Sequence, residues 1–118
     1  MNIEELRDYC LSKKGVEETM PFGPDTLVFK VMGKAFLLTG LDELSLQFNV
    51  KCDPEYAIEL REKFPCVIPG YHMNKKHWNT IIADGSVSEK QLHQWIDHSY
   101  EMVVKGLTKK EKEQLSNL

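Results

Sequence analysis

The sequence has 118 residues, of which 42% are hydrophobic and 28% are charged. This length and composition are typical of one globular domain whose core would bury about 65% of its unfolded surface. Fifteen Lys and Arg residues stand against 18 Asp and Glu residues, which gives a net charge of −3. Because proteins bind polyanions mainly through lysines and arginines, any such binding here must be confined to a local basic patch.

The composition also bears on the cellular compartment. No apolar run approaches the 18 residues or so that a membrane-spanning helix needs, and the first residues do not resemble a signal peptide. The three cysteines, Cys10, Cys52 and Cys66, are an odd number and contain no Cys-x-x-Cys pair. We therefore expect reduced thiols in a cytoplasmic protein that has no membrane partner.

The first half of the chain is predicted to form one helix followed by three antiparallel strands. Asn2 and Glu5 have the spacing of a capping box, which starts the helix. In the third strand apolar and polar residues alternate, so one face is packed and the other is wet. The apolar residues of that strand are Leu44, Leu46, Phe48 and Val50. The predicted elements are a helix over residues 3–14 and strands over residues 26–32, 35–41 and 44–50, with turns at Gly33-Lys34 and Asp42-Glu43. The wet face of this sheet is the first place to look for a binding surface.

The second half is predicted to alternate helices with one clear strand. Asp53-Pro54 is an N-cap followed by proline and opens a helix over residues 54–64. Residues 77–83 form a strand, and Ser88 caps a long amphipathic helix that Gly106 closes. Thr108 opens a short charged helix at the end. This order predicts an α+β two-layer sandwich over residues 1–118, in which helices cover one face of a mainly antiparallel sheet.

The densest polar stretch runs from Pro69 to Thr80 and contains no carboxylate. Its ammonium, imidazole, amide and aromatic groups suit phosphates and exposed bases. The candidate nucleic-acid contacts are Tyr71, His72, Asn74, Lys75, Lys76, His77 and Asn79. We assign Trp78 to the core. The alternative interpretation is purely structural, a turn and a strand with Tyr71 also in the core and the lysines solvated.

Catalytic, metal and cofactor sites have no support in the sequence. Cys52 and Cys66 are 14 positions apart, which is not the spacing of a zinc knuckle. His93 and His98 are five apart on one predicted helix, so they point to different sides. Neither a glycine-rich phosphate loop nor a nucleophile motif is present. We expect no catalytic residues, no metal and no cofactor.

Charge is unevenly distributed along the chain. Residues 42–62 carry a local balance of −4, whereas residues 71–80 carry +2 before any histidine is protonated. Four further lysines, Lys105, Lys109, Lys110 and Lys112, crowd the C-terminal end. If that end and the 71–80 block lie on one side, they form a basic patch on an acidic protein.

Several segments together resemble the MmcQ/YjbR family. They are Pro21-Phe22-Gly23, Lys30–Lys34, Lys51–Glu55, Pro69–Thr80, Asp84-Gly85-Ser86 and Asp97–Tyr100. The resemblance covers nearly the whole chain. It implies a small bacterial cytosolic domain with a secretion-chaperone-like fold of order α-β(3)-α-β(2)-α. Members of this family are commonly labelled predicted DNA-binding proteins with a double-wing motif, and the family offers no catalytic residues to carry over.

Three functional hypotheses follow from the sequence. The first is a non-enzymatic module that binds DNA weakly and in a salt-sensitive way through Tyr71–Thr80. The second is a protein-interaction module that resembles a dimeric chaperone and presents an apolar surface near the sheet. The third is a small-ligand binder or enzyme with His72 and His77 in a pocket.

Overall fold

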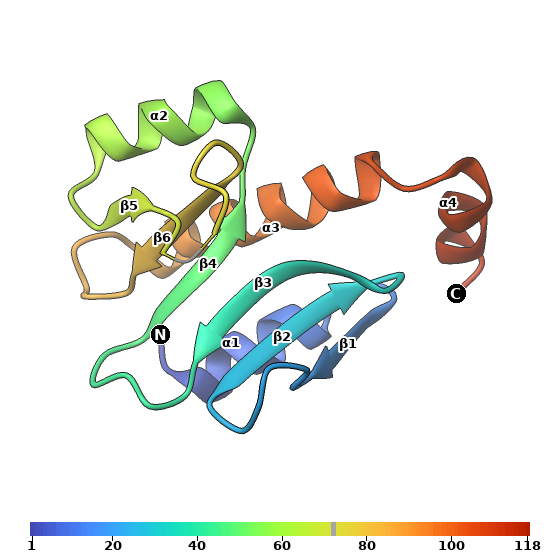
Figure 1. The fold of residues 1–118 in the computed structure, drawn as a ribbon, viewed down its shortest axis with the longest axis horizontal. Coiled ribbons are helices and arrows are strands. Elements are labelled where there is room, and N and C mark those ends of the chain that lie inside the picture. The colour runs from blue at the N-terminus through green and yellow to red at the C-terminus, as the bar shows by residue number, and fades with distance from the viewer. Residues whose placement is uncertain (72) are drawn as a thin grey trace.

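The computed structural model describes residues 1–71 and 73–118, which form four helices and six strands (Figure 1). In chain order they are α1 (Ile3–Leu11), β1 (Val16–Thr19), β2 (Thr26–Val31), β3 (Lys34–Gly40), β4 (Gln47–Lys51), α2 (Pro54–Lys63), β5 (Val67–Pro69), β6 (Trp78–Ile82), α3 (Glu89–Lys105) and α4 (Lys109–Ser116). The strands form one sheet in the order β1-β2-β3-β4-β6-β5, and all neighbouring pairs are antiparallel. The predicted α+β class is confirmed.

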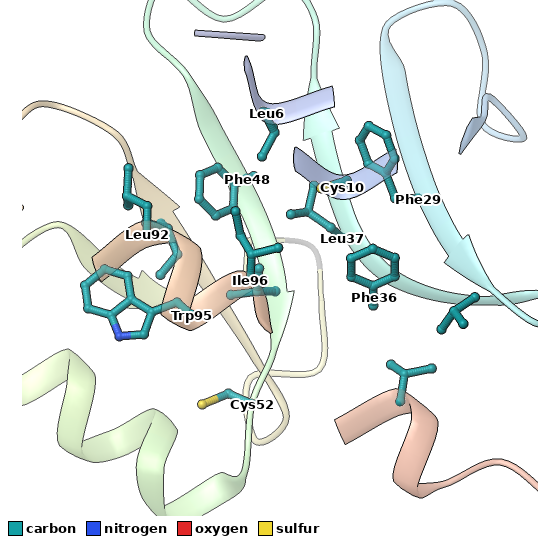
Figure 2. Packing of buried hydrophobic residues seen from close by; sticks show 14 of the residues in the cluster. Leu6, Cys10, Phe29, Phe36, Leu37, Phe48, Cys52, Leu92, Trp95 and Ile96 are labelled. Carbon is teal, nitrogen blue, oxygen red and sulfur yellow. The ribbon is translucent and has the colours of Figure 1, made fainter. Parts of the chain in front are cut away.

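The helices meet one face of the sheet, and the core lies between them. Large apolar side chains of α1, α3 and the central strands pack there (Figure 2). α2 adds Ala57 and Leu60 to the same core, and α4 adds Leu115. Asn2 and Glu5 form the predicted capping box of α1, and Thr108 and Glu111 form one at the start of α4. Helix starts and helix faces were therefore predictable from local sequence.

Four local features differ from the prediction. The first helix ends at Leu11 instead of residue 14, and Ser12 is its C-cap, with a hydroxyl that donates to the carbonyl of Tyr9. The strand β1 was not predicted; it pairs with β2 over only four residues. The β2–β3 turn is centred on Met32-Gly33, which have φ angles of 50° and 78°. Positive φ at both positions is typical of a type I′ hairpin turn, and glycine adopts it without strain.

The third predicted strand begins later than expected. β4 starts at Gln47, and its ladder to β3 stops at the Thr39–Phe48 pair, where the Thr39 hydroxyl donates to the carbonyl of Gln47. The preceding loop lies outside the ladder, and Leu44 is fully exposed there, at 107%. The alternation of apolar residues was therefore misleading beyond the point where strand pairing ends.

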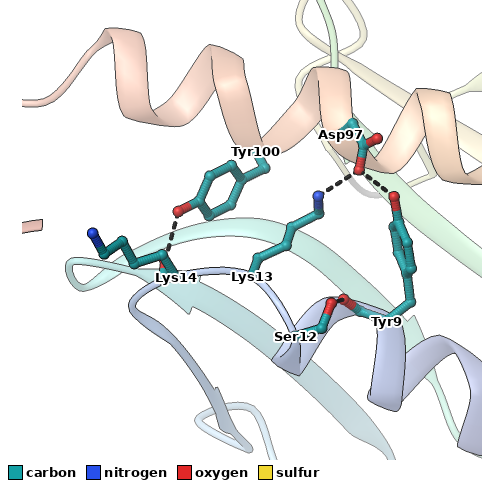
Figure 3. A network of polar contacts seen from close by, with 6 residues as sticks. All are labelled: Tyr9, Ser12, Lys13, Lys14, Asp97 and Tyr100. Carbon is teal, nitrogen blue, oxygen red and sulfur yellow. Dashed lines mark hydrogen bonds and ion pairs between the residues drawn. The ribbon is translucent and has the colours of Figure 1, made fainter. Parts of the chain in front are cut away.

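A polar cluster joins the end of α1 to α3 (Figure 3). The Tyr9 hydroxyl donates to Asp97 Oδ1 at 2.6 Å, and Lys13 forms an ion pair with the same carboxylate. The Tyr100 hydroxyl donates to the carbonyl of Lys14 at 2.6 Å. Burial and the neighbouring Asp97 raise the pKa of Tyr9 well above its usual range, so the phenol stays a donor. These contacts hold α3 against α1 and against the turn that follows α1.

Candidate nucleic-acid interface

The sheet opens between β3 and β4, and a serine of α3 fills the opening. The ladder between the two strands extends only from Leu37–Val50 to Thr39–Phe48. Beyond it, the N–H of Lys51 donates to Ser99 Oγ at 2.8 Å, and the Ser99 hydroxyl donates to the carbonyl of Phe36. Ser99 is fully buried. Its hydroxyl therefore satisfies two backbone groups that would otherwise lack partners in the core.

The opening continues at the surface as a groove of about 390 Å³, which we call the basic groove. One wall is the start of β3, with Lys34 and Ala35, and the other is formed by Lys51 and Trp78 from β4 and β6. α3 contributes its last turn and the glycine that follows it. The lining residues are Gly33, Lys34, Ala35, Lys51, Trp78, Val103 and Gly106. Two ammonium groups from separate strands thus share one groove with an indole ring.

The loop between β5 and β6 approaches this groove and depends on one glycine. Gly70 and Trp78 close the loop with a backbone hydrogen bond of 2.9 Å. A Cβ atom at Gly70 would lie 2.9 Å from both the Cβ and the carbonyl oxygen of Trp78, closer than packing permits. Within the loop, Asn74 Oδ1 accepts from the N–H of Lys76 at 2.9 Å, which is an Asx turn. Hydrogen bonds and close packing at Gly70 therefore fix the conformation of the described loop residues.

Arg61 on α2 anchors this loop from the core side. Its guanidinium donates to Asn79 Oδ1 at 2.6 Å and also to the carbonyls of Lys75 and Trp78. Asn79 is fully buried, and its amide nitrogen donates to the carbonyl of Ala57. Because both of its polar atoms bond within the protein, Asn79 supports the loop and is not among the groups that a nucleic acid could reach.

The other candidate contacts are distributed over two surfaces. Asn74, Lys75 and Lys76 are exposed, and the Lys75 ammonium also donates to the carbonyl of Gly70 at 3.0 Å. His77 is half-buried, and its carbonyl accepts from the N–H of Cys52. Tyr71 lies on another side of the loop and lines a different groove, on the open face of the sheet. His72 lies outside the described residues.

Trp78 was assigned to the core, and that assignment was wrong. Its indole is half-buried and lines the basic groove, because the cross-strand register pairs Trp78 with Lys51 on the face opposite the core. The predicted grouping of Trp78, Thr80 and Ile82 on one strand face agrees with this register. The core tryptophan is Trp95 on α3, which packs edge-on against Phe64. Tyr71 is likewise exposed, contrary to the purely structural interpretation.

The C-terminal lysines come close to the same groove. Gly106, which lines the groove, follows Lys105 in the chain, and Trp78, which also lines it, follows Lys76 and His77. At the start of α4, hydrogen bonds from Thr108 lower the pKa of the Glu111 carboxyl, and the nearby Lys34 ammonium lowers it further. The first turn of α4, with Lys109 and Lys110, therefore also lies near Lys34.

Three residues that shape this site escaped the sequence analysis. Lys34 is predicted only as a turn residue, and Lys51 and Arg61 are the two cations of the acidic stretch over residues 42–62. One signal was present, since Lys51 continues the alternation that places Gln47 and Asn49 on the wet face. The opening between β3 and β4 had no local signal, because it depends on Ser99, which is 48 residues away from Lys51.

The Cys52 thiol and the two imidazoles of α3 have structural environments. Burial raises the pKa of the Cys52 thiol to about 12, so the nucleophilic thiolate is disfavoured. His98 Nε2 accepts from the N–H of Asp53, and His93 stacks on Tyr9 with ring centroids 3.7 Å apart. Among the described residues, no group of three or more His, Cys, Asp and Glu side chains is placed to hold a metal ion.

An antiparallel sheet with helices on one face and a basic groove at a strand opening defines the class of this protein as an α+β two-layer domain. A sequence model of the YjbR family matches residues 11–102, and the chain belongs to this family. It is 38% identical to protein YbdF of Escherichia coli O157:H7 over 95% of this chain and 92% of that protein. It is 32% identical to protein YjbR of Escherichia coli K12 over the full length of both.

Solved structures agree with the fold. The crystal structure of Deinococcus radiodurans protein DR2400 matches 98% of this chain and 88% of its own, with a TM-score of 0.90 and 40% identity. A crystal structure of a Pseudomonas syringae protein matches 86% of this chain and 98% of its own, with a TM-score of 0.76 and 29% identity. In the part of the chain that the structure describes, no helix has the length and apolar character to cross a membrane.

Proposed function

We propose that the protein binds nucleic acid weakly, without catalysis, through the basic groove. One observation carries this proposal: Lys34 and Lys51, from two different strands, line the same groove as the half-buried indole of Trp78. Two ammonium groups can bind successive phosphates, and the indole offers an aromatic surface to a base or sugar.

The surrounding charges support a phosphate contact. Trp78 and Gly106 line the groove. Lys76 and His77 come just before Trp78 in the chain, and Lys105 comes just before Gly106. Because Glu111 lies near Lys34 and the whole protein is acidic, we expect few phosphate contacts and micromolar or weaker affinity.

This proposal keeps part of the candidate contact set and adds to it. Lys75, Lys76, His77 and Asn74 remain contacts from the loop, and Lys34 and Lys51 join them. Asn79 becomes a support for the loop, and Tyr71 belongs to the other groove. The centre of the interface therefore shifts from the loop alone to the groove beside it.

The test is fluorescence anisotropy of a labelled DNA duplex and of its single strand, titrated with protein at increasing NaCl. We expect affinity to fall with salt, and we expect K34E/K51E to reduce the logarithmic salt slope by about 2 for the duplex, because two phosphate contacts are lost. These two lysines are preferable to Lys75, whose ammonium also holds the loop closed.

The matched control is K63E/K90E, which lowers the net charge by the same amount. Lys90 lies in the first turn of α3, about 24 Å along that helix from Gly106 at the groove, and Lys63 ends α2. A general effect of charge would weaken binding equally in both double variants. Equal loss in both, or no salt-dependent binding by the parent protein, would contradict the proposal.

A further inference from the structure

The face of the sheet opposite the helices carries a continuous row of side chains. The cross-strand register aligns one residue from each strand, beginning at the β1 edge: Thr19, Val28, Leu38, Asn49, Thr80 and Ile68. Val28 and Leu38 are buried but do not belong to the core cluster beneath the helices. This second face therefore has an apolar floor of its own.

A groove of about 910 Å³ lies over this floor, and we call it the sheet-face groove. Phe22, in the loop before β2, and Tyr71 and Met73, in the loop before β6, also line it. Phe22 is 73% exposed and Tyr71 is 68% exposed. The N–H of Tyr71 donates to Thr80 Oγ1 at 3.0 Å, which fixes this part of the loop beside the row. Two exposed aromatic side chains beside a buried aliphatic floor are typical of the centre of a protein interface.

The charges of the sheet-face groove are opposite to those of the basic groove. Three carboxylates, Asp25, Asp42 and Glu43, line it with one cation, Lys30. Lys30 lies opposite Glu17 across the β1–β2 ladder. The ion pairs found between described residues engage other carboxylates, Glu18 and Asp97. This surface therefore offers negative charge to an incoming group and disfavours a phosphate backbone.

We propose that the sheet-face groove is a docking site for an amphipathic, cationic segment of a partner protein. Apolar side chains of the segment pack on Val28 and Leu38 between Phe22 and Tyr71, and its Lys or Arg residues meet Asp25, Asp42 and Glu43. A small-molecule site encloses most of its ligand. Here the exposed Phe22 and Tyr71 leave the groove open to solvent, and a peptide segment would cover both aromatic side chains where a small ligand would not.

The experiment uses two synthetic peptides of about 16 residues, long enough for a helix of about 24 Å. Both have the same amphipathic pattern of leucines, but one carries lysines and the other glutamates on the polar face. Each labelled peptide is titrated with the protein by anisotropy, and amide shifts of the isotope-labelled protein locate the contact. We expect the Leu/Lys peptide to bind at least about tenfold tighter than the Leu/Glu peptide. We also expect shifts at Val28, Leu38 and Tyr71.

Exposed residues of the groove and of α2 allow matched variants that are expected to leave the fold intact. F22S removes an aromatic side chain of the groove, and I58S removes an exposed apolar side chain from α2. D42K/E43K reverses two groove charges, and E59K/E62K reverses two exposed charges on α2. We expect F22S and D42K/E43K each to weaken binding of the Leu/Lys peptide by about tenfold or more, while I58S and E59K/E62K stay within about twofold.

Three results would overturn the proposal. One is equal affinity for the two peptides, or no binding of either; another is shifts confined to the helices. The third is a concentration-dependent dimer in sedimentation, with amide shifts on this face as the concentration rises. A second copy of the chain would then be the occupant of the sheet-face groove. The outcome is distinguishable from that of the proposed nucleic-acid site, because Val28 and Tyr71, where shifts are expected, line the sheet-face groove and not the basic groove.

Discussion

Leu37 and Leu38 are neighbours in β3, yet they face opposite sides of the sheet. Leu37 is fully buried in the core beneath the helices, whereas Leu38 is 9% exposed and lines the sheet-face groove. The helices cover the first side chain, and residues of the strands and loops surround the second. The two faces therefore differ in what encloses them, and low exposure alone does not show which face is complete without a partner.

The largest expected effect comes from comparing these two leucines directly. Leu37→Ala should destabilise the protein by about 3–5 kcal/mol, because it leaves a cavity in a close-packed core. Leu38→Ala should cost only about 1–2 kcal/mol, because the groove is open to water and no closed cavity forms. Urea unfolding of both variants measures the difference. Equal losses would mean that the open face is packed as tightly as the closed one.

A smaller effect is expected where α3 reaches through the opening between β3 and β4. Ser99→Ala should cost about 1–3 kcal/mol, because the carbonyl of Phe36 and the N–H of Lys51 lose their shared partner in a buried place. Ser45→Ala, in the exposed loop before β4, should stay within about 0.5 kcal/mol. If Ser99→Ala also stays within that range, the two strands can close on each other and the basic groove does not need Ser99.

Most of the structure on the helix-covered side of the sheet could be predicted from the sequence, because the signals there are local. The Asn2 and Thr108 caps, the Asp53-Pro54 start of α2 and the apolar face of α3 all depend on residues within a few positions of one another. The sequence-based predictions were wrong where the local structure depends on residues far away in the chain. The alternation at Leu44 was interpreted as a strand, but pairing with β3 had already ended there.

The candidate sites were less predictable for the same reason. The 69–80 block was recognisable by composition, but its residues separate in space: Asn79 enters the core, Tyr71 joins the sheet-face groove, and Trp78 lines the basic groove. Alternation along β6 separates Asn79 from Trp78, but whether a face is covered by helices depends on elements far away in the sequence. Phe22 and Leu38 had no sequence signal as partners, because the fold of the loop before β2 brings them to the same groove.

The attachment of α1 to α3 can be weakened by substitutions that leave the apolar core residues unchanged. Tyr9→Phe removes the hydroxyl that donates to Asp97 and should cost about 1 kcal/mol. Asp97→Asn also weakens the Lys13 ion pair, so the double variant should show coupling between Tyr9 and Asp97 in a mutant cycle by urea unfolding. Additive losses would contradict the proposed attachment of α1 to α3 through this carboxylate.

The smallest expected effect is a pH dependence of stability that comes from His98, a residue of α3 on the helix-covered side of the sheet. Burial lowers the pKa of His98 below its usual value of 6.5, although Glu101 and Asp53 oppose the shift. The folded protein therefore binds this proton less readily than the unfolded chain does, so protonation favours unfolding. The stability that depends on neutral His98 is complete above about pH 6.5 and is lost as the pH falls toward the lower folded-state pKa.

His98→Gln tests this dependence, because a glutamine oxygen can still accept the N–H of Asp53 but cannot be protonated in this range. Between pH 7.5 and pH 5, about the range in which a histidine titrates, the parent protein should lose more stability in urea unfolding than the variant does. The difference between the two should be constant above pH 7. Parallel curves across the whole range would show that His98 does not link protonation to the packing of α3 against α2.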